Sequence, residues 1–164
     1  MRMTKTRAAA ALIALAFSRR AHAQTSTAAD SSAVVAAVDH LFDAMARRDT
    51  TAARALLMPG SQFISLRTGA ETTPPRRQAD STFLRSLAGG REKLLERMWT
   101  PSVHVHGPIA VVWAPYDFHI DGKFSHCGVD TFSLVRTATG WQISSISYTV
   151  EQTGCAPSPL GTPR

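Results

Sequence analysis

The chain has 164 residues, the usual size of one domain. Its formal charge of +6 is typical of a nucleic-acid binder, but five basic and no acidic residues fall within positions 1–23. The other 13 basic and 12 acidic residues nearly cancel, which removes the main support for nucleic-acid binding. A hydrophobic content of 44% excludes a disordered chain.

Residues 1–23 have the pattern of an export signal. Basic residues precede the apolar stretch 8–17, which is too short to span a bilayer as a helix. The sequence Ala21-His22-Ala23 then matches the small-x-small cleavage pattern. We predict cleavage after Ala23 and a secreted or periplasmic protein that has no further contact with the membrane. The alternative is an uncleaved N-terminal anchor.

Export affects the interpretation of Cys127 and Cys155, because a disulfide persists in an oxidising compartment. We predict that they pair; two buried free thiols are the alternative. Neither cysteine has a second cysteine at zinc-site spacing. His104 and His106 alternate along a strand and could share a metal, but no acidic partners follow at a clear spacing. We therefore expect no metal and no cofactor.

The first half of the mature chain predicts helices. After a flexible lead-in over residues 24–30, a helix is expected from 31 to 48, because one apolar stripe recurs at helical spacing. The stripe consists of Val34, Val38, Leu41, Phe42 and Met45. Shorter helices are expected over 51–58, where Pro59-Gly60 ends the helix, and over 81–88. Between them we expect a strand over 62–66 and an exposed loop over 67–78.

The second half predicts strands. Residues 102–106, 109–120, 123–135 and 141–150 are rich in β-branched and aromatic side chains, whereas 91–99 is ambiguous between helix and strand. Asp121-Gly122 is a strong signal for a two-residue hairpin turn. Residues 156–164 contain three prolines and are expected to be a disordered tail. Helices followed by an antiparallel meander indicate an α+β domain.

A two-residue turn at Asp121-Gly122 sets a strand register. It places Asp117 opposite His126 and Trp113 opposite Asp130, all on one face of the sheet. That face is apolar at one end and polar at the other. The opposite face is also apolar, so both must be buried. Helices can cover one face, and we expect a homodimer through the other, outer face.

The segments VVWAPYDF (111–118) and DGKFSHCGVD (121–130), followed by Gly140-Trp141, resemble secreted bacterial members of the nuclear transport factor 2-like superfamily. That superfamily includes SnoaL-like polyketide cyclases, ketosteroid isomerases, scytalone dehydratase and proteins provisionally described as lumazine-binding. The resemblance covers residues 33–155 and implies one domain over 31–155. In it a cone-shaped, curved antiparallel sheet (a cystatin-like roll) wraps around the N-terminal helices, and its concave face lines a pocket. The resemblance also favours a strand beginning within 91–99.

The resemblance and the predicted register together indicate a secreted domain that binds a small apolar or aromatic molecule. The expected ligand-binding residues are Val111, Trp113, Phe132, Trp141 and Ser147. One alternative is an acid–base enzyme of isomerase, dehydratase or cyclase type that uses Asp117, His126 and Asp130, with neighbouring carboxylates raising the pKa of His126. Another is a protein-interaction module that has a vestigial pocket and uses the outer sheet face.

Overall fold

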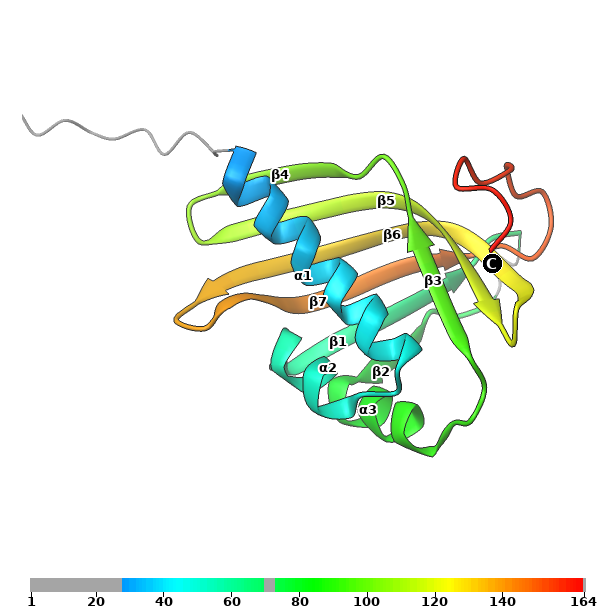
Figure 1. The fold of residues 1–164 in the computed structure, drawn as a ribbon, viewed down its shortest axis with the longest axis horizontal. Helices are drawn as coiled ribbons and strands as arrows, with labels where there is room; N and C mark the ends of the chain where they lie inside the picture. The colour runs from blue at the N-terminus through cyan, green and yellow to red at the C-terminus, as the bar shows by residue number, and fades with distance from the viewer. Residues whose placement is uncertain (1–27, 70–72, 164) are drawn as a thin grey trace, which may run out of the picture.

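The computed structural model describes residues 28–69 and 73–163 (Figure 1). The predicted export signal over 1–23 and most of the predicted lead-in lie outside these residues. Within them, no helix combines the length and hydrophobicity needed to cross a membrane. Seven strands form one sheet, with three helices before β3.

Helix α1 (Ala28–Ala46) begins three residues before its predicted start. Its predicted apolar stripe is confirmed, since Val34, Val38, Leu41 and Phe42 are buried. Helix α2 (Thr50–Leu56) is capped by Asp49, whose carboxylate accepts hydrogen bonds from two backbone amides of the first turn. The predicted stop at Pro59-Gly60 is wrong, because β1 (Leu57–Arg67) begins directly after the helix and includes both residues. Helix α3 is Asp80–Gly89.

The sheet is mixed. Its strand order is β2-β1-β7-β6-β5-β3, and β4 also pairs with β5. The remaining strands are β2 (Arg76–Ala79), β3 (Leu94–Met98), β4 (Ser102–His106), β5 (Ile109–Ile120), β6 (Lys123–Thr137) and β7 (Gly140–Val150). β2 lies in the segment predicted as a loop. All neighbouring strands run antiparallel except β1 and β7, which are parallel. This parallel pair distinguishes the sheet from the predicted antiparallel meander.

The sheet curves around α1, which crosses its concave face, while α2 and α3 lie beside β1 and β2 (Figure 1). This confirms the predicted α+β class and the curved sheet wrapped around the helices. The core fills the space between α1 and the concave face. Its largest members with almost no exposure include Leu41, Val112, Phe132, Leu134 and Ile143.

The register of the β5–β6 hairpin differs from the prediction beyond its first two pairs. The turn is as expected, with positive φ at both Asp121 (52°) and Gly122 (75°). A bulge then makes Ser125 an extra residue on β6, so that Phe118 pairs with His126. Because side chains alternate along a strand, this one-residue slip puts His126 and Asp130 on the face opposite to that of Asp117 and Trp113.

The slip means that Asp117 faces Cys127 rather than His126, and Trp113 faces Thr131 rather than Asp130. The predicted pairs Asp117–His126 and Trp113–Asp130 are therefore wrong. A second bulge, between Ser133 and Leu134, similarly shifts β6 against β7.

Candidate functional site

A cavity of about 350 Å³ opens on the concave face of the sheet. This is within the usual range for small-molecule pockets, roughly 300–1,000 Å³. It lies between the C-terminal half of α1, one face of α3, and the strands. Its apolar walls include Leu41, Phe42, Met45, Phe63, Phe83, Leu87, Leu94, Phe118, Phe132 and Ile146.

Aromatic rings hold part of this wall in place. The rings of Phe63 on β1 and Phe83 on α3 are stacked, with centroids 4.5 Å apart. Phe42 on α1 meets Phe132 on β6 edge to face at 5.9 Å. The wall is thus assembled from elements that are distant in sequence, and its shape depends on the packing of both helices on the sheet.

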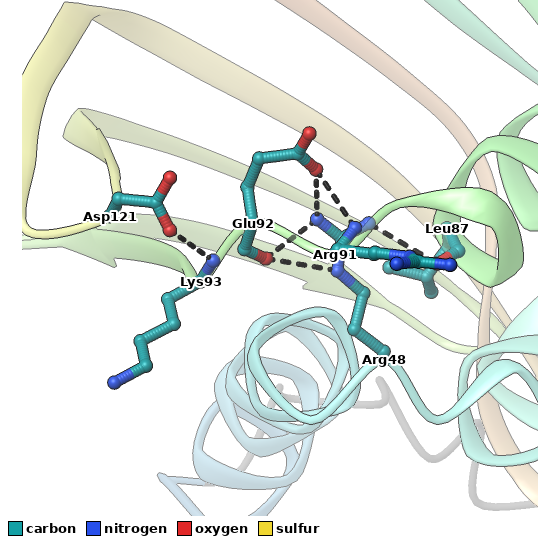
Figure 2. A network of polar contacts seen from close by, with 6 residues as sticks. All are labelled: Arg48, Leu87, Arg91, Glu92, Lys93 and Asp121. Atoms are coloured by element: carbon teal, nitrogen blue, oxygen red, sulfur yellow. Dashed lines mark hydrogen bonds and ion pairs between the residues drawn. The ribbon is translucent and has the colours of Figure 1, made fainter.

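A polar network around Arg48 ties part of the rim together (Figure 2). Arg48 follows α1 with a φ of 56°, and its guanidinium donates to the carbonyl oxygen of Leu87 and to both the carbonyl and carboxylate oxygens of Glu92. A Cβ on Gly90 would lie 2.0 Å from Nη1 of Arg48, so a larger residue there would displace the guanidinium from this network. The end of α1, the end of α3 and the approach to β3 are therefore held together.

Two carboxyl groups, the half-buried Glu96 and the buried Asp130, contribute the main polar feature of the cavity. Glu96 lies on β3 and Asp130 on β6, and both side chains face the concave side. Asp130 is 2% exposed, and its Oδ2 has no hydrogen-bond partner among the described residues.

Their surroundings favour the neutral forms. Burial raises the pKa of Glu96 to about 7, although a hydrogen bond from Asp130 opposes that rise. Burial, followed by the charge and hydrogen bonding of Glu96, raises the pKa of Asp130 well above its ordinary value. Asp130 is therefore the protonated partner at neutral pH, and Glu96 changes charge near neutrality.

Two tyrosines flank this pair. The hydroxyl of Tyr116 donates to the backbone oxygen of Thr149 over 2.7 Å. This close approach requires Gly128, because a Cβ there would lie 2.3 Å from the same oxygen. Burial is the largest cause of the raised pKa of both Tyr116 and Tyr148, and the nearby carboxyls add to it. Both tyrosines are therefore neutral hydroxyl groups.

His126 also lines the cavity, in a mostly aromatic environment. Its ring lies 5.1 Å from that of Phe118 and 5.7 Å from that of Tyr116, and its Nδ1 is 3.0 Å from the hydroxyl of Ser125. Burial and then the charge of Arg67 lower its pKa. The predicted rise in the His126 pKa is therefore wrong, because Asp117 is not its neighbour.

Of the predicted ligand-binding residues, only Phe132 lines the cavity. Of the predicted catalytic residues, His126 and Asp130 line it and Asp117 does not. Val111 and Trp113 lie on the outer face, 40% and 47% exposed. Ser147 is opposite Thr131 on that same outer face. Trp141 is a core residue whose ring lies 4.7 Å from the Arg136 guanidinium.

Asp117 belongs to a separate ion-pair network on the outer face. Arg97 on β3 donates to both of its carboxylate oxygens, over 2.8 Å and 2.5 Å, and His119 Nε2 lies 3.5 Å away. Burial alone would raise the pKa of Asp117, but the hydrogen bonds and charge of Arg97 lower it. This arrangement indicates a structural role.

The predicted disulfide is confirmed: Cys127 and Cys155 are bonded across a separation of 28 residues. Residues 156–163 form neither helix nor strand, and the carbonyl oxygen of Gly161 accepts a hydrogen bond from Arg97. The disulfide and this contact attach the C-terminal segment to the outer face.

Other predicted features lie away from the cavity. His104 and His106 point outward from β4 and are exposed, while Val103 and Val105 pack on the core. Among residues 28–69 and 73–163, no group of three or more His, Cys, Asp or Glu side chains is placed to hold a metal ion.

Sequence reasoning missed Glu96, Tyr116 and Tyr148. Glu96 lies in the segment 91–99, which is ambiguous in sequence, and the predicted hairpin register puts both tyrosines on the face opposite Asp117 and His126. A usable signal was Gly128, since a glycine inside a strand marks a bulge or a close backbone approach.

Solved structures place this arrangement in a known fold. A Streptomyces avermitilis protein of the NTF2-like family, provisionally described as a dehydratase, matches 74% of this chain and 96% of its own at 21% identity, with a TM-score of 0.60. A Salmonella enterica protein of the nuclear transport factor 2-like superfamily matches 77% of this chain and 94% of its own at 16% identity, with a TM-score of 0.60. A Nostoc punctiforme protein of unknown function with a cystatin-like fold matches 82% and 97% at 8% identity, with a TM-score of 0.63.

No family model matches the sequence, and neither does any curated protein. The chain has the nuclear transport factor 2-like fold. The shared fold agrees with the resemblance seen in the sequence.

Proposed function

We propose that the concave cavity binds a small, largely apolar molecule with an uncharged hydrogen-bonding group. The observation that carries this proposal is a ligand-sized cavity with aromatic walls and one buried carboxyl pair. The walls bury the apolar part of the ligand. The Oδ2 of Asp130, which lacks a partner among the described residues, supplies a hydrogen-bonding position that a ligand can satisfy.

Binding of N-phenylnaphthylamine, an uncharged aromatic probe that fluoresces in apolar sites, tests this proposal. Ser86 lines the cavity from α3 and is exposed, so Ser86→Trp should fill the opening without disturbing the core. The neighbouring Arg85 does not line the cavity, and Arg85→Trp is the matched control. We expect saturable binding by the wild type and by Arg85→Trp, and about tenfold weaker binding by Ser86→Trp. Equal binding by all three proteins would refute the proposal.

The carboxyl pair favours a second candidate function, that of an acid–base enzyme. A base is most effective when its pKa is near the working pH, and the pKa of Glu96 is raised to about 7 within a mostly apolar cavity. Glu96 would take a proton from the bound substrate, and protonated Asp130 would stabilise developing negative charge. This version of the predicted acid–base site retains Asp130 and His126 and replaces Asp117 with Glu96.

Ring opening of nitrobenzisoxazole provides a direct test of a positioned base. The base removes the ring C–H proton as the N–O bond breaks, and the coloured cyanophenolate leaves. We expect a rate that rises with pH through about 7 and is lost in Glu96→Gln. Asp117→Asn, on the outer face, is the control that should keep the rate. A rate equal in wild type and Glu96→Gln would exclude this second function.

We also infer that the protein functions in a secreted or periplasmic setting. The disulfide supports this inference, because such bonds persist in oxidising compartments. Mass spectrometry of the exported protein tests it: the mature chain should begin at Gln24. An intact N-terminus would count against cleavage.

A further inference from the structure

A second cavity, of about 310 Å³, adjoins the first. It lies where β1 and β7 end and where β6 and β2 begin. Its lining is largely polar and consists of Ser65, Arg67, Thr73, Pro74, Arg76, Ser125, His126, Tyr148, Val150 and Gln152. His126 and Tyr148 line both cavities, so the two spaces meet at these side chains.

Two arginines give the second cavity a positive charge. Arg67 acts electrostatically on His126, and Arg76 acts on Tyr148, so both charges reach the boundary between the cavities. No acidic side chain within 28–69 or 73–163 lines this space, and neither arginine forms an ion pair with a carboxylate of those ranges. Guanidinium groups bind carboxylate, sulfonate and phosphate groups with directed hydrogen bonds.

The cavity also contains neutral hydrogen-bond donors. Ser65 lies on β1, two residues from Arg67, and Ser125 is the extra residue at the β6 bulge. The bulge thus adds a hydroxyl to the wall and places His126 on the concave face. Together the hydroxyls and the arginines suit a compact anion.

The two cavities have opposite electrostatic preferences. The burial that raises the pKa of Glu96 and Asp130 also disfavours an anion in the first cavity, whereas Arg67 and Arg76 favour one in the second. A molecule bound across His126 and Tyr148 has one preferred orientation, with its apolar body toward α1 and α3 and its charged group toward the arginines.

We propose that the ligand is an amphipathic anion whose carboxylate, sulfonate or phosphate group binds between Arg67 and Arg76 while its apolar body occupies the first cavity. This inference rests on the proposed binding function and specifies its ligand class. The uncharged group near Asp130 and the anionic group near the arginines are then two separate recognition points on one molecule.

Two dyes separate the contributions of the cavities. Anilinonaphthalene sulfonate has the ring system of N-phenylnaphthylamine plus one sulfonate, so the pair differs in the anionic group alone. We expect Arg67→Gln and Arg76→Gln each to weaken binding of the sulfonate by about tenfold while leaving the uncharged dye within about twofold. Arg77→Gln is the matched control, because Arg77 is next to Arg76 on β2 but outside the cavity. Ser86→Trp should weaken binding of both dyes.

Each outcome has a distinct meaning. If the uncharged dye binds but the sulfonate is insensitive to both arginine variants, or is equally sensitive to Arg77→Gln, the anion site is refuted and the binding function stands. If the sulfonate depends on the arginines but not on Ser86→Trp, the ligand does not span the two cavities and this proposal is overturned. If neither dye binds, the proposed function and this inference both fail.

Discussion

Replacing Glu96 by Gln should change how stability depends on pH. Burial raises the pKa of the Glu96 carboxyl from 4.5 to about 7 in the folded protein. The folded state therefore holds a proton that the unfolded chain releases, and the two states differ most between these pH values. Stability from this group is fully present below pH 4.5, falls as the pH rises and is lost above pH 7.

The magnitude follows from the size of the pKa change. At about 1.4 kcal/mol per pKa unit, the rise corresponds to about 3 kcal/mol of unfolding free energy. Glutamine has nearly the same shape and does not titrate. The Glu96→Gln variant should therefore gain about 3 kcal/mol relative to wild type between pH 4.5 and pH 7. Because the charge and hydrogen bonding of Glu96 also raise the pKa of Asp130, the difference between the two proteins reports on the carboxyl pair.

Urea denaturation followed by tryptophan fluorescence provides the measurement, at several pH values across that range. Glu92→Gln is a control of opposite sign. Hydrogen bonds from backbone amides and from Arg48 lower the pKa of the exposed Glu92, so its contribution is present at neutral pH and lost on acidification. A wild-type-minus-Glu96→Gln difference that stays constant with pH would show that Glu96 is not held in an environment favouring its neutral form.

Three further comparisons between variants test other parts of the structure. Gly128→Ala should destabilise the fold by about 1–3 kcal/mol through overpacking, because the new Cβ would meet the Thr149 oxygen at 2.3 Å. Gly89→Ala is the control and should be tolerated, because its new Cβ would meet no atom within 4 Å. Equal melting temperatures of the two variants would contradict the argument. Cys127→Ser/Cys155→Ser should cost about 3–4 kcal/mol by removing the constraint on the unfolded chain, and reductant should lower the melting temperature of wild type but not of this variant. Asp117→Asn should lower stability by about 3 kcal/mol because Arg97 loses its charged partner, and it should leave dye binding unchanged. His126→Gln should weaken dye binding, because His126 lines the cavity. If Asp117→Asn weakened dye binding and His126→Gln did not, Asp117 rather than His126 would line the cavity.

Local chemistry explains which parts of the fold could be predicted. The Asp121-Gly122 turn, the apolar stripe of α1 and the cysteine pair each depend on short-range patterns or on residue type. The bulge at Ser125 has no comparable turn or spacing pattern, and Gly128 on the same strand is its nearest sequence signal. One extra residue was enough to exchange the faces, which moved Asp117, Val111 and Trp113 from the expected pocket to the outer surface.

The carboxyl pair was harder to predict than the fold. Asp130 was identified as a candidate, but its partner Glu96 is 34 positions earlier, on a strand that does not neighbour β6. β5, which pairs with both β3 and β6, brings the two strands to neighbouring positions in the sheet. Alternation of Leu94, Glu96 and Met98 on one face does place a charge in an otherwise apolar row, once residues 94–98 are known to form a strand. The predicted homodimer through the outer face stays a prediction; Ile109 and Trp113 are exposed there.

The position of β7 has a consequence for the order in which the protein folds. β7 lies between β6 and β1 in the sheet, although it is the last strand along the chain (Figure 1). Until residues 140–150 are available, β1 lacks its parallel neighbour and the wall containing Ile146 and Tyr148 is missing. Pairing of such distant segments is slow. A chain that leaves the ribosome from its N-terminus therefore cannot complete this part of its core until residues 140–150 have been synthesised.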